Sequence, residues 1–118
     1  MKVVERRWTR EPDLLEQNRK TAKLQFVAVD KTRNEADGKL RLFAIDGIGS
    51  EGALMAYTPD NSWLWASDYI QNVSNPSAYA TEVWQAVERA GLKPRQVAAM
   101  HIPLTPWMTI EALAKPKP

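Results

Sequence analysis

The chain has 118 residues, of which 44% are hydrophobic and 25% charged, with a formal net charge of +2. This is the composition of a single globular domain. It has no cysteine, which excludes disulfides, thiolate metal sites and cysteine nucleophiles. No apolar run approaches the roughly 20 residues of a membrane span, and MKVVERRWTREPD at the N-terminus lacks the apolar core of a secretory signal. We therefore expect a cytoplasmic protein with no membrane partner.

Charge is distributed unevenly along the chain. Residues 1–41 carry 11 Lys/Arg against 7 Asp/Glu, residues 42–92 carry one Arg against six acids, and residues 93–118 carry four basic residues against one acid. Nucleic-acid binding needs a concentrated basic patch with interleaved aromatic side chains. A basic run such as the N-terminal one is more typical of a solvated surface, so nucleic-acid binding is kept only as a second alternative.

One domain is predicted over residues 1–118, with an N-terminal arm and short helix in residues 1–22 and a tail at residues 116–118. Short runs of branched and aromatic residues predict strands, and Asp37-Gly38 and Pro59–Asn61 supply turn chemistry between them. The predicted strands span residues 23–29, 39–46, 53–57, 62–67 and 95–101.

The clearest predicted helix is NPSAYATEVWQAVERAG, residues 75–91. Asn75 is a suitable N-cap, Pro76 suits the first helical position, and Gly91 is typical of the residue that follows a helix. A last helix is predicted over residues 105–115. The residues expected on the buried stripe of the first helix are Tyr79, Val83, Val87 and Ala90, with Ala86 beside them.

The stretch DGIGSEG places Gly47, Gly49 and Gly52 in the G-x-G-x-x-G spacing of dinucleotide-binding sites. That motif must lead from a strand into a helix whose N-terminal N–H groups hold the phosphates. The segment that follows, ALMAY, is too short for such a helix before TPDN interrupts it. We therefore expect a turn between two strands and no nucleotide site. The G-x-S-x-G nucleophile elbow is absent as well.

The order of the remaining motifs resembles part of a known hydrolase fold. The SEG of the glycine loop is followed by ALMAYTP, WLWASD, a helix, GLKPRQVAAMH, and PW with a second helix. This order resembles the C-terminal half of metallo-β-lactamase-fold hydrolases over about residues 24–114, within a unit predicted at 23–115. The resemblance implies an α/β (α+β) fold, half of an αββα sandwich, with one mixed sheet of about five strands and two to three helices.

The resemblance also implies a zinc site at the sheet edge, of which this chain keeps little. The family's N-terminal His-x-His-x-Asp-His motif is missing, because His101 is the only histidine. Asp68 matches the family's metal-bridging Asp, His101 matches its last His, and Gly49 stands at the lost position of a third ligand. A catalytic zinc needs about three protein ligands. We therefore expect no catalytic residues in the isolated chain, and zinc only if a partner chain supplies further ligands.

Asp68 and His101 also have interpretations that need no metal. An Asp at a strand end is typical of a turn or cap residue, and a lone His is more often solvated or hydrogen-bonded than a ligand. The two residues are also candidates to pair with each other, as the remnant of a site without a metal.

Trp63, Trp65 and Tyr69 are the candidate ligand or interface residues. Because Trp63 and Trp65 alternate along their strand, we expect them on opposite faces of the sheet, one in the core and the other in need of cover. Half a sandwich leaves a sheet face and an edge that are usually closed by pairing. A homodimer is therefore expected, or a complex with an N-terminal half-domain that carries the His motif.

Three functions follow from these observations. The first is a non-catalytic, degenerate half-domain that serves as a binding or oligomerisation module for an unknown ligand. The second is a subunit or fragment of a zinc-dependent hydrolase whose metal site another chain completes. The third is nucleic-acid binding through the basic arm.

Overall fold

A computed structural model describes residues 21, 28–29, 35–36, 38–75 and 78–116. The predicted N-terminal helix lies outside the described residues, as does most of the predicted strand at 23–29. Ala28 and Val29, at the end of that segment, are described and do not lie in a strand.

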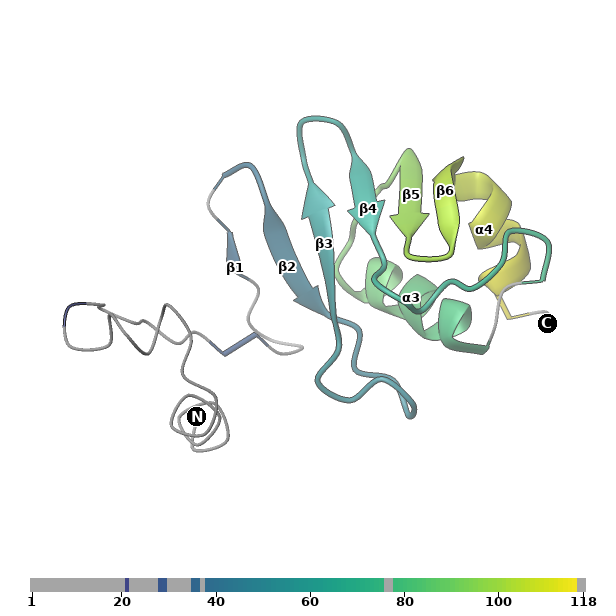
Figure 1. Cartoon of the computed structure of the whole chain (residues 1–118), viewed down its shortest axis with the longest axis horizontal. Helices are drawn as coiled ribbons and strands as arrows, with labels where there is room; N and C mark the ends of the chain where they lie inside the picture. The colour runs from purple at the N-terminus through teal and green to yellow at the C-terminus, as the bar shows by residue number, and fades with distance from the viewer. Residues whose placement is uncertain (1–20, 22–27, 30–34, 37, 76–77, 117–118) are drawn as a thin grey trace.

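One mixed sheet forms the centre of the described structure (Figure 1). Its six strands lie in chain order, and all neighbours are antiparallel except β4 and β5, which are parallel. Helix α3 makes the crossover that a parallel pair requires. The elements are β1 (Glu35–Ala36), β2 (Arg41–Ala44), β3 (Leu54–Thr58), β4 (Trp63–Trp65), α3 (Ala78–Arg89), β5 (Gln96–Ala99), β6 (Ile102–Pro106) and α4 (Trp107–Ala114).

The mixed sheet with two helices confirms the predicted fold class, and β2 to β5 lie within or overlap predicted strands, whereas β1 falls in residues 33–38, which were expected to form a turn. β6, which pairs antiparallel with β5, was not predicted from the sequence. Pro103 and Pro106 hid this strand, because proline is depleted in strands and is tolerated only at edges, strand starts or bulges. In the described residues β6 is an edge strand, which is where two prolines are compatible with a sheet.

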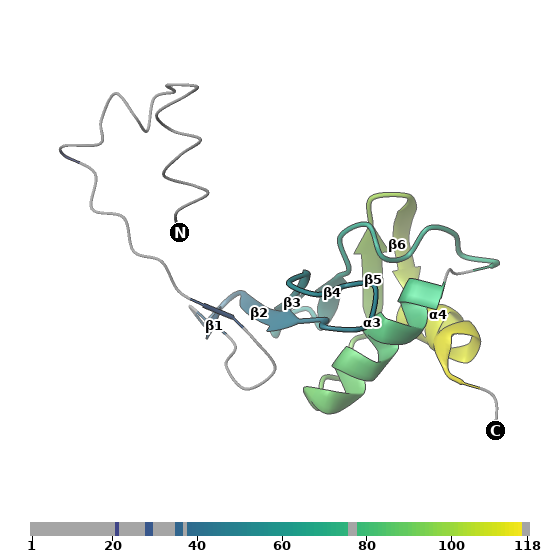
Figure 2. The same cartoon turned by 90° about the horizontal axis from the view of Figure 1, so that it is seen from below.

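Both described helices cover the same face of the sheet (Figure 2). The core lies between them and that face, and one cluster of buried residues fills it. Its members from the sheet include Phe43, Met55, Tyr57, Leu64 and Val97, and those from the helices include Ala80, Val83, Ala86, Val87, Ile110 and Ala114. Neither helix is long and apolar enough to cross a membrane, so the described residues contain no candidate span.

Helix α3 confirms the predicted helix in its centre and at its C-terminus. Gly91 has φ +63°, its N–H donates to the carbonyl of Glu88, and the N–H of Leu92 donates to the carbonyl of Val87. This pair of bonds is a Schellman motif, and the left-handed conformation favours glycine. The predicted stripe was wrong at its first residue. Tyr79 is exposed at 44%, and Ala80 takes the buried position.

Candidate functional site

The glycine loop, residues 46–52, joins two antiparallel strands, β2 and β3, as expected. β2 pairs directly with β3, and the loop between them is closed by hydrogen bonds from Ile45 N to Ala53 O, at 3.0 Å, and from Ala53 N to Ser50 O, at 3.0 Å. A dinucleotide fingerprint must open a helix, and a strand follows here. The glycine spacing therefore has another cause.

The cause is the close approach of α3 to the loop. A Cβ atom at Gly47 would overlap the side chain of Glu82, and one at Gly49 would overlap the ring of Tyr79. The Glu82 carboxylate accepts hydrogen bonds from the Gly49 N–H, at 3.1 Å, and from the Ser50 hydroxyl, at 2.5 Å. The Ser50 hydroxyl oxygen in turn accepts the Gly47 N–H at 2.8 Å. Glycines at positions 47 and 49 therefore leave room for Glu82 and Tyr79 where α3 packs against the loop.

Asp68 and His101 are brought together at the ends of the two parallel strands. Beyond β4 and β5 the parallel pairing continues through hydrogen bonds from Ala66 N to Ala98 O and from Met100 N to Ser67 O. This continuation places His101 Nε2 2.7 Å from Asp68 Oδ1, with both side chains half-exposed. Gln71 Nε2 donates to the same Asp68 oxygen at 2.9 Å. The two residues thus pair with each other, one of the alternatives drawn from the sequence.

This arrangement does not fit a catalytic zinc. Such a zinc needs about three protein ligands and an open position, and Gly49 contributes no side-chain donor while Tyr79 fills the space beside it. Among the residues that the structure describes, no group of three or more His, Asp or Glu is placed to hold a metal ion. Asp68 and His101 remain a pair of potential donors that are already bonded to each other.

The expectation for the two tryptophans was wrong. Trp63 and Trp65 point to the same face of the sheet, because side chains two residues apart in a strand share a face. They are exposed at 44% and 46%, and Leu64 between them is the core residue. Tyr69 lies elsewhere: it is partly buried against the core, and its ring meets that of Tyr79 edge-on, with centroids 5.8 Å apart.

We call the sheet face turned away from the helices the open face. Ala56 and Ala98 are the residues opposite Trp65 in the neighbouring strands, so small side chains flank the indole on both sides. A groove of about 160 Å³ results, and no charged residue lines it. The open face includes Leu40, Leu54, Ala56, Thr58, Trp63, Trp65, Ala98 and Leu104. Of these, sequence reasoning had singled out only the two tryptophans, although period-two alternation in 54–58 and 63–65 contained the signal.

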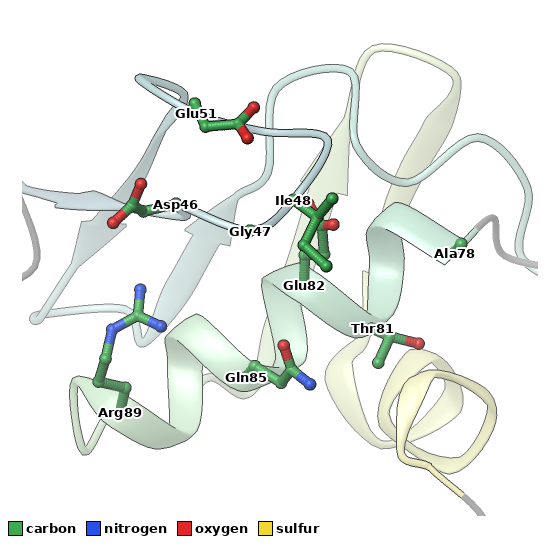
Figure 3. A pocket seen from close by; sticks show the side chains of 9 residues that line it. All are labelled: Asp46, Gly47, Ile48, Glu51, Ala78, Thr81, Glu82, Gln85 and Arg89. Carbon is green, nitrogen blue, oxygen red and sulfur yellow. The ribbon is translucent and has the colours of Figure 1, made fainter.

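A second hollow lies between the glycine loop and α3 (Figure 3). Its volume is about 700 Å³, and Asp46, Glu51 and Glu82 give it a mainly acidic lining. Arg89 extends from the end of α3 toward the loop, and its Nη2 donates to the carbonyls of Ala44 and Ile45, at 2.9 and 2.8 Å. Arg89 therefore ties the end of α3 to the end of β2. No local pattern in the sequence indicates this contact, because the two segments lie more than 40 residues apart.

No protein-family model matches the chain, and no curated protein matches its sequence. Solved structures match its fold. The crystal structure of VMB-1 superposes with a TM-score of 0.57 at 12% identity, covering 86% of this chain and 50% of that one. A metallo-β-lactamase from Hirschia baltica gives 0.54 at 15% identity, covering 87% and 53%. The DIM-1 metallo-β-lactamase gives 0.55 at 14% identity, covering 86% and 52%.

At these identities the similarity concerns the fold. The chain spans about half the length of the solved structures it matches. The fold expected from the order of motifs is thereby confirmed. The chain has the fold of about half of a metallo-β-lactamase.

Proposed function

We propose that this chain is a non-catalytic half-domain that associates with a second copy of itself through the open face of its sheet. The observation that supports this most strongly is the exposed pair of tryptophans on one face of β4. A sheet normally buries such a face against a second layer. The matched structures are about twice as long, so a second layer of similar size is the natural cover.

A second copy suits this face electrostatically. The groove is lined by apolar and small side chains and Thr58, with no charge. The grooves of two copies therefore meet without placing like charges against each other, and a two-fold contact requires only self-complementary surfaces. The same surface carries a ridge formed by Trp63 and Trp65 and a hollow at Ala56 and Ala98. In a two-fold dimer the ridge of each copy would fill the hollow of the other.

The size of the face also suits a dimer. A fully covered tryptophan buries 150–250 Å², so the two half-exposed indoles together present roughly 200 Å². The exposed leucines at positions 40, 54 and 104 bring the apolar area to the order of 400 Å². Two such faces with their polar rims approach the roughly 1,200 Å² at the lower end of specific interfaces.

The described edges of the sheet suit pairing less well than its face. β6 carries Pro103 and Pro106, which remove backbone donors from that edge. Among the described residues, β1 comprises Glu35–Ala36 at the other edge. The proline-containing edge opposes strand-to-strand association.

The test is the native mass of the full chain by sedimentation from low to high micromolar concentration. Leu104 on the open face and Leu113 on α4 form a matched pair, exposed at 44% and 50%. We expect wild type and the Leu113→Lys control to dimerise, and Leu104→Lys to remain monomeric, because it buries a charge in the contact. A wild-type chain that is monomeric throughout, or a Leu104→Lys chain that dimerises like the control, would overturn the proposal.

A further inference from the structure

We propose that a clamp between α3 and the glycine loop, made by Tyr79 and Glu82, has taken over the position of a metal ligand and closed it. The inference concerns the end of the sheet where Asp68 and His101 lie and is independent of the open face. It predicts that a histidine placed at position 49 would not create a zinc site.

The first support is steric. Gly49 is outside the set of residues with positive φ, so its backbone would accept any L-residue. A Cβ atom at position 49 would instead overlap the Tyr79 ring. The ring also meets Tyr69 edge-on, at an interplanar angle of 88°. Tyr79 is partly exposed, so a side chain at position 49 would push its ring outward and cost it the contact with Tyr69.

The second support is that polar groups of the glycine loop are hydrogen-bonded to the Glu82 carboxylate of α3. One Glu82 carboxylate accepts from both the Gly49 N–H and the Ser50 hydroxyl, and Ser50 is buried. One turn earlier on α3, Tyr79 packs on the same loop residue, Gly49. Residues three apart on a helix lie on the same side. The first two turns of α3 thus hold the loop by one apolar and one polar contact, with no need for a metal.

The third support is that Asp68 and His101 are already bonded to each other and, through Asp68, to Gln71. Asp68 Oδ1 lies 2.7 Å from His101 Nε2 and accepts from Gln71 Nε2 at 2.9 Å. A metal bound through Asp68 Oδ1 and His101 Nε2 would have to replace the contact between them. It would still have only two protein ligands, one fewer than a catalytic zinc site uses.

The steric part is tested by a double-mutant cycle on melting temperature. Gly49→Ala is expected to lower the melting temperature by about 3 °C or more, because the Tyr79 ring must move and give up its edge-on contact with Tyr69. The control Ile48→Ala, at a nearly fully exposed position in the same loop, is expected to shift it by less than about 2 °C. In a Tyr79→Ala background the Gly49→Ala effect should fall to less than half. A Gly49→Ala chain as stable as wild type, or an effect that Tyr79→Ala leaves unchanged, would overturn the clamp.

The metal part is tested by equilibrium dialysis against zinc alone. Gly49→His and the control Ile48→His are both expected to hold no more zinc than wild type, and zinc should not raise the melting temperature of either. A Gly49→His chain that binds one equivalent of zinc and is stabilised by it, where Ile48→His is not, would show that position 49 is still open to a ligand. Neither experiment depends on whether the chain dimerises.

Discussion

Trp63 and Trp65 share the open face of β4 while Leu64, between them, is buried in the core. Three consecutive residues therefore have two different tasks. Leu64 holds the sheet against the helices, and the two indoles present an apolar surface to the outside. Substitutions of Leu64 are therefore expected to change mainly the stability of the fold, and substitutions of Trp65 mainly its association.

Leu64→Ala is expected to lower the free energy of unfolding by about 2–5 kcal/mol, the usual effect of deleting a fully buried leucine side chain. Trp65→Ser is expected to lower it by less, at concentrations where the chain is monomeric, and to abolish association. The measurements are urea denaturation at low concentration and sedimentation at high concentration. A Trp65→Ser chain that associates like wild type would contradict this division of tasks.

Association through the open face should make thermal stability depend on concentration. A partner that binds only the folded chain stabilises it by mass action, so the melting temperature of a dimer rises with protein concentration. We expect this rise for wild type and its absence for Trp65→Ser, measured by circular dichroism over a hundredfold range of concentration. If the melting temperature rose equally with concentration in the two proteins, the association would involve another surface of the molecule.

The Asp68–His101 pair should contribute little to stability. Both side chains are half-exposed, and even a fully charged pair in contact with solvent is worth only about 0–1 kcal/mol. His101→Ala and Asp68→Asn are therefore each expected to change the free energy of unfolding by less than about 1 kcal/mol. Urea denaturation measures this. A much larger loss would show that the pair supports the turn between β5 and β6 more strongly than its geometry indicates.

The polar side of the clamp should matter more than that exposed pair. Glu82→Ala leaves the buried hydroxyl of Ser50 without its acceptor, and an unsatisfied buried group costs about 1–3 kcal/mol. Glu88→Ala, at an exposed position on the same helix, is the matched control and should cost less than about 0.5 kcal/mol. Equal effects of the two substitutions in urea denaturation would remove the evidence for the Glu82 contact.

The end of α3 gives a prediction that depends on backbone conformation alone. Gly91 has φ +63°, and a Cβ atom added there would have open space around it, so a side chain is strained without any clash. Gly91→Ala is expected to cost about 1–2 kcal/mol. Gly91→Asn should cost less, because Asn adopts this conformation more readily. If urea denaturation gave the reverse order for Ala and Asn, the Schellman assignment would be wrong.

Local signals made much of this fold predictable. The Gly91 stop, the turn at Pro59–Asn61 and the apolar runs of β2, β3 and β4 each have a direct physical cause in neighbouring residues. The prolines of β6 obscured it, because an edge strand tolerates residues that a strand pattern excludes. The predicted N-terminal helix and most of strand 23–29 lie outside the described residues.

The site was less predictable than the fold, because it depends on contacts between distant segments. The pairing of Asp68 with His101 was among the alternatives, because the resemblance placed both residues at ligand positions of one site. The role of Tyr79 was not, because helical spacing placed it on the buried stripe and could not reveal that the glycine loop would reach it. Trp63 and Trp65 were wrongly predicted on opposite faces of the sheet. Residues two apart in a strand lie on the same face.

Dimerisation through the open face is tested most directly by the chemical reactivity of each tryptophan at low and high protein concentration. Oxidative footprinting read by mass spectrometry distinguishes Trp63 and Trp65 on the open face from Trp107, which is buried in the core. We predict that Trp63 and Trp65 react readily in dilute protein and become protected as the chain associates, while Trp107 stays protected throughout. Unchanged reactivity of Trp63 and Trp65 in the associated protein would contradict the proposed dimer, because the open face would then still be open.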